Sequence, residues 1–512
     1  MDQTLATEIM HAGHNVLLTG PAGCGKTHTL NAFIREAKQT GKRVSVTATT
    51  GLAATHLGGN TIHAWSGIGI HNQLPGNFFS SLSKSRADII NKTDVLVIDE
   101  ISMLHDYRLD MIEEVARHVR GNAKPFGGLQ VILCGDFFQL PPVSRAGEPA
   151  SQFVVASEAW QNLEPIVCYL NEQHRQNDDK FLEILSAIRS GDVRRHHAEM
   201  LLERVDGELA QNSKVTQLHT TNVDVDTINA RQLQQLDEQP KHYTMTLTGS
   251  KNYQESLKRS CLAQEKLALK KGALVMCIKN NQEKKYVNGS LGTVIDFAND
   301  TGYPVVELKN GRTITIEPDT WELRDGDKKR ASISQIPLRL AWAVTVHKSQ
   351  GMTLDAARIN LKRAFVEGMG YVALSRVKSL SSLQLEGLNQ MALMVSQEAL
   401  AIDNQLREQS GVATTELAHL RANAKTRKAT QKSAPKAGTW TEKLATMRQK
   451  YPNAYRPWQD KDDKALSALF SKGKPVHIAK LTKKFGRHPG SIRARLVKLF
   501  GEDAVLKTNS KK

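Results

Sequence analysis

Residues 20–27 read Gly-Pro-Ala-Gly-Cys-Gly-Lys-Thr, which fits the phosphate-binding pattern GxxxxGK[ST] in full. An apolar run at 15–19 precedes this segment, and a helical pattern over 27–38 follows it. Strand, loop and helix in this order are the context that makes the pattern credible. The glycines let backbone N–H groups approach phosphate oxygens, and the start of the helix adds the positive end of its dipole. The segment therefore predicts an α/β domain with a phosphate site at the end of a strand.

Apolar runs without alternation recur along the first third of the chain, at 44–48, 95–98 and 129–133. Continuous apolar runs are typical of strands in a parallel sheet that is covered on both faces. Helical patterns separate these runs, so we predict a doubly wound α/β domain over residues 1–165.

A second α/β domain is predicted over residues 166–400, because strand and helix patterns continue after 166 and return after 338. Between them, glycines punctuate short β-rich pieces over about 250–335, which is typical of a small antiparallel barrel. We therefore expect a β-barrel insertion within the second α/β domain.

Positive charge is concentrated near the C-terminus. The chain holds 69 Lys and Arg against 52 Asp and Glu, a net charge of +17, and residues 401–512 alone hold 25 basic and 9 acidic residues. Residues 401–440 are poor in large apolar groups and predict a flexible basic linker. Residues 441–512 carry three short helical patterns with a tight turn, typical of a helix-turn-helix-like module, with Arg493 and Arg495 on the third helix. We predict that this module binds DNA; a protein-docking module and a solubilising tail are the alternatives.

Two acids close the apolar run at 95–98. Asp99 is a candidate ligand for Mg²⁺ together with Thr27, and Glu100 is placed to orient or deprotonate an attacking water. Lys26 should pair with the β- and γ-phosphates of a nucleotide. The predicted cofactors are therefore ATP and Mg²⁺. The alternative for the two acids is a solvated strand end without a ligand.

A second polar group follows the run at 129–133. Gln139 lies just beyond the predicted strand, where ligands bind in open α/β sheets, so it could sense the γ-phosphate. Hydrolysis also needs positive charge against the developing phosphate charge. Arg175 and Arg376 are the candidates, although the arginine content alone does not select them.

Taken in order, these motifs resemble a superfamily 1 DNA helicase of the Pif type (petite integration frequency), which is related to the RecD-like helicases. The resemblance covers about residues 1–400. The matching segments are Gln3, 20–27, 47–54, 61–65, 99–103, 110–117 with 125–128, 135–143, 174–176, 344–354 and 371–377.

The resemblance implies two RecA-like P-loop motor domains that unwind duplex DNA with ATP and move 5′-to-3′ on single-stranded DNA, in DNA repair, recombination or replication. It implies that Gln3 reads the adenine. It also implies that Gln139, Arg175 and Arg376 surround the γ-phosphate. The expected nucleotide-binding set is completed by Gly20, Gly23, Gly25 and Gly351. The basic module at 441–512 is not part of the motor pattern.

Single-stranded DNA is expected to lie across both α/β domains. Backbone phosphates would meet N–H and hydroxyl groups, while bases would stack on aromatic rings. The candidate contacts are Thr49, Thr50, His63, Trp65, Phe137, Thr345, His347 and Ser349. Core packing is the alternative for Trp65, and a structural hydrogen bond is the alternative for His63 and His347.

The expected partners are single-stranded and tailed duplex DNA, with RNA–DNA hybrids and single-stranded-DNA-binding proteins as further candidates. No apolar stretch reaches the length of a membrane span, so we expect no membrane partner and a cytoplasmic, DNA-associated monomer. Two other functions compete with the helicase: a DNA-binding ATPase switch that does not unwind, and a binding module whose catalytic site has decayed. The second is disfavoured because the predicted catalytic and metal residues are all present.

Overall fold

The computed structural model forms two compact units, Met1–Ala424 and Lys425–Lys512, which are described separately. The structure describes residues 1–69, 71–142, 152–174, 176, 178–205, 215–261, 263–279, 281, 285–286, 289–309, 311–325, 328–424, 427, 444, 447–470 and 478–500. Among these residues, no helix is both long and apolar enough to cross a lipid bilayer.

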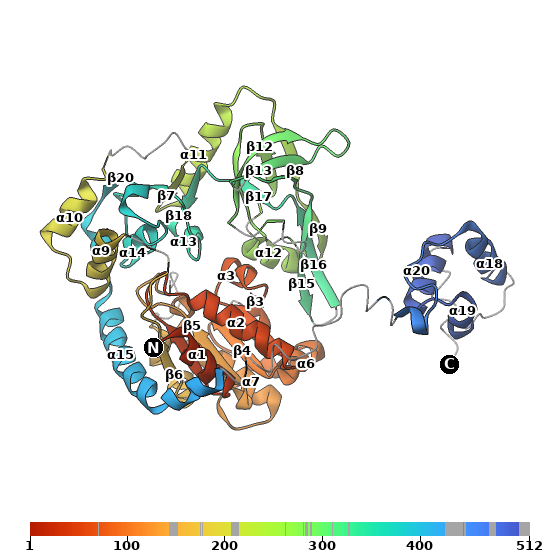
Figure 1. Cartoon of the computed structure of the whole chain (residues 1–512), viewed down its shortest axis with the longest axis horizontal. Coiled ribbons are helices and arrows are strands. Elements are labelled where there is room, and N and C mark those ends of the chain that lie inside the picture. The colour runs from red at the N-terminus through yellow and green to blue at the C-terminus, as the bar shows by residue number, and fades with distance from the viewer. Residues whose placement is uncertain are drawn as a thin grey trace. The chain divides into compact units, whose positions relative to one another are not determined.

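The first unit begins with a six-stranded parallel sheet in the order β3-β2-β4-β5-β1-β6 (Figure 1). Its strands are β1 (Val16–Thr19), β2 (Val44–Ala48), β3 (Asn60–Thr61), β4 (Val95–Asp99), β5 (Gln130–Cys134) and β6 (Ile166–Tyr169). The four apolar runs noted in the sequence are thus confirmed as β1, β2, β4 and β5. The predicted boundary at 165 is wrong, because β6 pairs with β1 and belongs to the first sheet.

Helices cover both faces of this sheet, as continuous apolar strands require. Val16 and Leu18 face one core with Phe33, while Leu17 faces a second core with Ile112. The helices are α1 (Gln3–His11), α2 (Lys26–Gln39), α3 (Gly51–His56), α4 (Ile62–Ser66), α5 (Phe78–Ser81), α6 (Lys84–Lys92), α7 (Asp106–Arg120) and α8 (Glu158–Leu163), with short 3-10 turns η1 (Ile101–Met103), η2 (Pro125–Gly128) and η3 (Val154–Ala156).

A second parallel sheet has the order β18-β7-β19-β20. Its strands are β7 (Thr216–His219), β18 (Ala343–Thr345), β19 (Ala357–Leu361) and β20 (Leu383–Leu388). The helices of this part are α9 (Asp179–Ser190), α10 (Arg195–Leu202), α11 (Asn222–Gln234), α13 (Val346–Ser349) and α14 (Met369–Leu374), with 3-10 turns η4 (Leu380–Ser382) and η5 (Gln390–Leu393). The expected second α/β part is therefore present.

Antiparallel β structure is inserted between β7 and β18, as predicted, and it spans 241–340 rather than 250–335. Its strands form sheets in the orders β14-β13-β12-β11-β17, β15-β16-β9 and β10-β8. They are β8 (Lys241–Thr244), β9 (Thr246–Gly249), β10 (Lys266–Leu269), β11 (Leu274–Cys277), β12 (Leu291–Phe297), β13 (Pro304–Leu308), β14 (Thr313–Thr315), β15 (Asp319–Asp325), β16 (Lys328–Gln335) and β17 (Leu338–Leu340), with helix α12 (Lys251–Ser260) between β9 and β10. A separate core, which includes Leu267, Val294 and Leu338, holds the largest sheet together. Closure into a barrel stays a prediction.

The predicted linker at 401–440 is wrong over its first part. Helix α15 (Gln397–Glu416) and the turn η6 (Ala418–Leu420) continue the first unit there. Helix α15 lies along β6 (Figure 1), where the Tyr169 N–H donates to Ser410 Oγ at 3.0 Å. Only a few large apolar groups, such as Ile402 and Leu406, are needed for this docking, so the composition gave no sign of it. Residues 425–426 and 428–440 of the predicted linker lie outside the described residues.

The second unit contains the three expected helices α18 (Asp460–Phe470), α19 (Ile478–Phe485) and α20 (Pro489–Phe500). Leu466, Leu481, Phe485, Ile492 and Leu496 form their core. Gly486 has a φ of 59°, so the tight turn between α19 and α20 uses the left-handed region that glycine adopts without strain.

Candidate active site

A cavity of about 350 Å³ lies between the two parallel sheets of the first unit. The first sheet's side contributes Ala22, Gly23, Gly25, Lys26, Thr27, His28, Asp99, Glu100, Cys134, Gly135 and Gln139, while Gly351, Thr353, Arg376 and Lys378 come from the second and His174 from the connection. The cavity thus brings together most of the predicted catalytic residues, which lie far apart in the sequence. It is polar and has walls from both α/β parts.

The loop between β1 and α2 has the backbone shape that a phosphate site needs. Gly23 and Gly25 have φ values of 90° and 89°, which a side chain would strain. A Cβ on Gly20 would come within 2.4 Å of the Leu170 carbonyl oxygen. These glycines are therefore required by the loop itself, as the pattern predicted.

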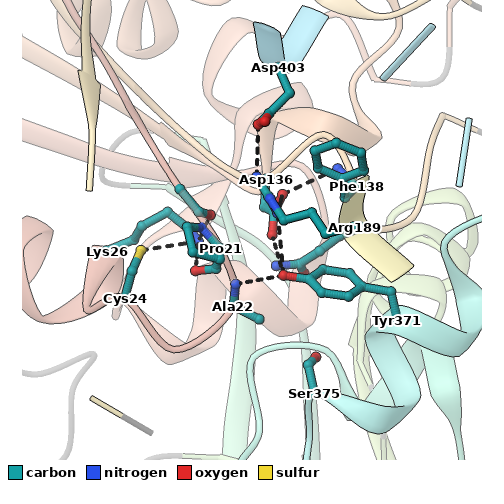
Figure 2. Close-up of polar contacts among 12 residues, drawn as sticks. Pro21, Ala22, Cys24, Lys26, Asp136, Phe138, Arg189, Tyr371, Ser375 and Asp403 are labelled. Atoms are coloured by element: carbon teal, nitrogen blue, oxygen red, sulfur yellow. Dashed lines mark hydrogen bonds and ion pairs between the residues drawn. The ribbon is translucent and has the colours of Figure 1, made fainter. Parts of the chain in front are cut away.

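Lys26 points into this loop. Its Nζ donates to the carbonyl oxygens of Gly20 at 2.7 Å and Pro21 at 3.0 Å (Figure 2). Burial lowers the pKa of Lys26, but the acidic groups nearby, Asp136 among them, outweigh burial and raise it. The side chain is therefore an ammonium group whose two carbonyl partners can be exchanged for phosphate oxygens. The loop fits a nucleotide triphosphate in both shape and charge.

Gln3, the predicted adenine reader, lies beside the loop rather than away from it. Its Nε2 donates to the Cys24 carbonyl oxygen at 3.3 Å and lies 2.9 Å from His174 Nε2. The His174 N–H donates in turn to the Gly23 carbonyl oxygen at 3.1 Å. The segment that carries the predicted Arg175 is thus fastened to the phosphate loop. Arg175 itself lies outside the described residues.

Asp99 and Glu100 end β4 and face the cavity. Burial and, next, the neighbouring Asp99 raise the pKa of Glu100, Lys26 and Arg376 oppose them, and the net result is a pKa of about 7. Burial also raises the pKa of Asp99. Glu100 has a φ of 54°, a conformation that non-glycine residues adopt at a cost and that is often found at functional sites. A carboxylate with a pKa near neutrality suits the role of a general base.

Two amides surround Glu100. Gln350 Nε2 donates to Glu100 Oε2 at 2.9 Å and to Gln139 Oε1 at 3.1 Å. The Gln350 side chain therefore links Gln139 to Glu100, the candidate base. This is the neighbourhood that the predicted contact of Gln139 with a γ-phosphate requires. Gln350 belongs to a matching segment of the sequence, but nothing in the sequence alone gave it this role.

The oxygen atoms of Thr27 and Asp99 suit Mg²⁺, which prefers carboxylate and hydroxyl ligands and phosphate oxygens. Both side chains line the cavity, and Lys26 stands beside them. The donor set therefore fits the metal that the sequence predicted. The metal role of these two residues stays a prediction.

Arg376 is the predicted arginine that the structure places in the cavity. Its side chain is only 1% exposed, and its Nε donates to the Val372 carbonyl oxygen at 2.8 Å. Nη2 donates to Ser375 Oγ at 2.7 Å. Nη1 donates to the carbonyl oxygens of Ser349 and Met352 at 3.4 Å, so the guanidinium is held by its own part of the chain and lines the same cavity as Lys26.

Several predicted DNA contacts also have partners within the protein, and their role in DNA binding stays a prediction. The Thr49 N–H donates to the Asp99 carbonyl oxygen at 3.2 Å. The Thr49 hydroxyl donates to the Glu100 carbonyl oxygen at 3.0 Å. Thr345 Oγ1 caps α13 by accepting from the Lys348 N–H, and Ser349, fully buried, donates to the Val346 carbonyl oxygen. The hydroxyls of Thr49 and Ser349 thus donate to backbone acceptors, whereas that of Thr345 accepts from a backbone N–H. Thr50 Oγ1 similarly accepts from the Ala53 N–H but is partly exposed.

The predicted stacking aromatics are also buried. Trp65 is 4% exposed in the core, so its packing alternative is correct, and Phe137 is 3% exposed against Phe153 and Trp160. Phe365, by contrast, is 61% exposed and stacks on His347 with 6.3 Å between ring centroids.

The two predicted histidines therefore differ. His347 keeps a place at the surface beside Phe365. His63 contacts Arg108, with 3.3 Å between its Nε2 and Nη1, and burial lowers the pKa of His63 to about 4. His63 is thus a neutral, structural histidine at physiological pH.

The two predicted arginines of α20 also differ. Arg493 is exposed. Arg495 forms an ion pair with Asp463 on α18. This pair ties α20 to α18, and the DNA contact of Arg495 stays a prediction.

Sequence reasoning missed Arg189 and gave Tyr371 no role of its own. Both are buried beside the phosphate loop: the Ala22 N–H donates to the Tyr371 hydroxyl, which Arg189 also contacts (Figure 2). No local pattern marks Arg189, because its partners come from four distant segments. The matching segment 371–377 was the only available signal for Tyr371.

Comparisons with known proteins agree with this site. Residues 1–199 match the PIF1-like helicase family, and residues 252–297 match the 2B domain of DNA helicase Pif1. The ATP-dependent DNA helicase Pif1 of Psychrobacter sp. (strain PRwf-1) is 39% identical over 470 residues, covering 80% of this chain and 71% of the relative. The ATP-dependent DNA helicase PIF1 of Xenopus laevis is 36% identical over 421 residues, covering 81% of this chain and 66% of the relative.

Solved structures lead to the same family. The crystal structure of Pif1 helicase from Candida albicans matches with a TM-score of 0.70 and 33% identity, covering 79% of this chain and 98% of that one. The Bacteroides Pif1 helicase in complex with ADP-AlF3 and single-stranded DNA matches with a TM-score of 0.61 and 30% identity, covering 80% of this chain and 98% of that one. The sequence resemblance is therefore confirmed, and this chain belongs to the Pif1 family of ATP-dependent DNA helicases.

Proposed function

We propose that this chain unwinds duplex DNA with the energy of ATP hydrolysis while it moves 5′-to-3′ on single-stranded DNA, in repair, recombination or replication. The observation that carries the proposal is the cavity whose walls come from both α/β parts, with Lys26 on one wall and Arg376 on the other. A nucleotide held from both walls draws the parts together, and hydrolysis releases them. The alternation becomes movement if each part grips the DNA in turn.

The residues divide the work as follows. Lys26 holds the β- and γ-phosphates, Glu100 orients and deprotonates the attacking water, and Arg376 stabilises the charge that develops on the transferred phosphate. Thr27 and Asp99 would hold Mg²⁺, which neutralises phosphate charge when bound. Arg175 and Gln139 complete the γ-phosphate contacts in this proposal. The two α/β parts are RecA-like, and the insertion closes into a small barrel.

The proposed partners are single-stranded and tailed duplex DNA, which the complex of the Bacteroides relative with single-stranded DNA supports. His347 and Phe365 offer a surface ring pair on which bases can stack. RNA–DNA hybrids and single-stranded-DNA-binding proteins are further proposed partners of a DNA-associated cytoplasmic monomer.

Strand displacement tests the proposal against an ATPase switch that does not unwind. We expect ATP-dependent release of the labelled strand from a duplex with a 5′ single-stranded tail, and little release from the same duplex with a 3′ tail. The DNA stimulates ATP hydrolysis in both cases, so ATP turnover measured in parallel confirms engagement. Stimulated turnover without strand release on any tail would favour the switch.

For the second unit we propose a helix-turn-helix-like grip on duplex DNA that tethers the motor to its track. Helices α19 and α20 present exposed basic side chains on either side of their tight turn. These are Lys480, Lys483, Lys484, Arg493 and Lys498. The buried Arg487 instead donates to the carbonyl oxygens of Arg456 and Pro457, which makes it part of the framework.

Charge removal tests this grip in the full-length chain. Arg493→Ala combined with Lys498→Ala should weaken duplex binding and reduce the slope of log K against log salt by about 2, because each lost phosphate contact removes about one released counterion. Lys461→Ala combined with Lys464→Ala removes the same charge from exposed positions on α18 and should leave the slope unchanged. Equal slopes for the two double variants would contradict the grip. Binding is measured by fluorescence anisotropy across a salt series.

A further inference from the structure

A buried polar cluster lies directly behind the phosphate loop, outside the nucleotide cavity. It joins Ala22 of the loop, Asp136 after β5, Arg189 of α9, Tyr371 of α14 and Asp403 of α15 (Figure 2). These residues come from both α/β parts and from the helix that returns to the first sheet. The catalytic roles proposed above use none of them.

Tyr371 makes the contact with the loop. Its hydroxyl oxygen accepts the Ala22 N–H at 2.9 Å, across 349 residues of sequence, and lies 3.4 Å from Asp136 Oδ2. The ring is only 2% exposed. Backbone N–H groups of this loop are the groups that cradle phosphates. One of them is therefore held by a side chain from the opposite part of the motor.

Arg189 holds the tyrosine in place. Its Nη1 donates to Asp136 Oδ1 at 2.6 Å and to the Tyr371 hydroxyl at 3.3 Å, and its Nη2 donates to Asp403 Oδ1 at 2.9 Å. The guanidinium also lies 4.2 Å from the centre of the Phe138 ring. A buried arginine with two carboxylate partners is strongly fixed, since breaking one pair would leave an uncompensated charge.

Tyr371 and Arg376 are tied to the same short stretch of chain. Tyr371 lies on the short helix α14, and Arg376 follows directly after that helix. Arg376 Nε donates to the carbonyl oxygen of Val372, the residue next to Tyr371, so the guanidinium is anchored to the same turn. A shift of the loop against Tyr371 is therefore transmitted to the guanidinium in the nucleotide cavity.

There is space for such a shift. A second cavity of about 770 Å³ lies on the other side of the cluster and is lined by Ala22, Arg189, Tyr371 and Asp403, among others. Ala22 lines both cavities. Tyr371 lines the larger cavity, and the phosphate loop lines both, so open volume lies next to the loop on the side where the tyrosine holds it.

We propose that Tyr371 is a positioning residue for ATP hydrolysis. Its hydrogen bond with the Ala22 N–H fixes the position of the phosphate loop relative to α14, and this places Arg376 at the γ-phosphate. Arg189 holds the Tyr371 hydroxyl in place by a hydrogen bond. This inference rests on the proposed role of Arg376. It assigns Tyr371 no contact with the nucleotide, so the residue acts on turnover and not on nucleotide binding.

Tyr371→Phe, which removes one oxygen atom and keeps the ring, tests the proposal. We expect kcat of DNA-stimulated ATP hydrolysis to fall about ten- to a hundredfold, as small misplacements of a catalytic group do. The KM for ATP should stay within about twofold, because Lys26 and the loop still bind phosphate. Tyr169→Phe is the matched control: that hydroxyl belongs to the same cluster, bonded to Arg189 and Asp403, but does not contact the loop. It should lower thermal stability to a similar degree and leave kcat unchanged.

A double-mutant cycle then separates positioning from general damage. If Tyr371 acts through Arg376, Tyr371→Phe should cost nothing further in an Arg376→Ala background, measured in single-turnover experiments. The same large loss in both backgrounds, equal losses for Tyr169→Phe and Tyr371→Phe, or a Tyr371→Phe chain with wild-type kcat would overturn the inference. An Arg376→Ala chain with wild-type turnover would overturn the role of Arg376 itself, and the inference with it.

Discussion

Lys26→Ala should abolish ATP turnover, lowering kcat by about two to three orders of magnitude, in line with the loss of one preorganised charge at a developing anion. In the structure the ammonium group donates to two carbonyl oxygens of its own loop, at 2.7 and 3.0 Å, and weakly to Cys24 Sγ at 3.9 Å. Both carbonyl oxygens are exchangeable for phosphate oxygens. With alanine the loop retains its glycines and N–H groups but loses the charge that draws the phosphates in. Turnover is measured by phosphate release in the presence of single-stranded DNA.

Lys38→Ala is the matched control for this change, because Lys38 is an exposed lysine near the end of the same helix α2. It should leave turnover intact. Thermal unfolding distinguishes lost catalysis from lost fold: both variants should unfold near the wild-type temperature, but ATP should raise the midpoint only for Lys38→Ala, since a ligand stabilises the fold by binding it. Undiminished turnover in Lys26→Ala would show that the nucleotide is bound elsewhere.

Glu100→Gln should lower kcat by about two to four orders of magnitude, the usual contribution of a general base. The amide has the same shape and still offers an oxygen to Gln350 Nε2, which now bonds to Glu100 Oε2 at 2.9 Å. ATP should therefore still bind and still raise the unfolding temperature, which separates this variant from Lys26→Ala. Glu114→Gln, an exposed glutamate on α7, is the matched control and should be fully active.

The pH dependence of the wild-type chain follows from the same carboxyl. Burial first, and then Asp99, raise the pKa of Glu100 to about 7, so below that value the base is mostly protonated and inactive. The logarithm of kcat/KM should rise with a slope of one up to about pH 7 and level off above it. The residual activity of Glu100→Gln should lack this limb. A limb that persists in the variant would assign it to another group.

The sequence was informative wherever a local pattern decides the outcome. The glycines of the phosphate loop, the uninterrupted apolar strands and the acids that close β4 are each set within a few residues, and each is present as predicted. The placement of Arg376 followed from family resemblance. The roles of Arg189 and Asp403 could not be predicted, because each depends on partners more than fifty residues away.

What the sequence left open has a common physical cause. Thr49, Ser349 and Trp65 are polar or aromatic residues next to motifs, and such side chains serve either a ligand or the framework. The structure shows what each contacts within the protein: Thr49 donates to the Glu100 carbonyl oxygen, 51 residues away, Ser349 donates to that of Val346, and Trp65 packs in the core. Helix α15 was missed because its docking on β6 depends on contacts such as that between Tyr169 and Ser410, which are 241 residues apart in the chain.

The return of α15 to β6 limits how the two α/β parts can move relative to each other. The chain crosses between its two sheets once after β6 and once before α15, and the Arg189–Asp403 ion pair of 2.9 Å fastens the two crossings to each other. Two chain connections held side by side act as a hinge: they permit rotation of one part relative to the other and resist sliding or separation of the two parts. When ATP binding rotates one part about this hinge, the displacement of an atom grows with its distance from the hinge. We therefore expect the largest displacement of each cycle at the inserted β sheets.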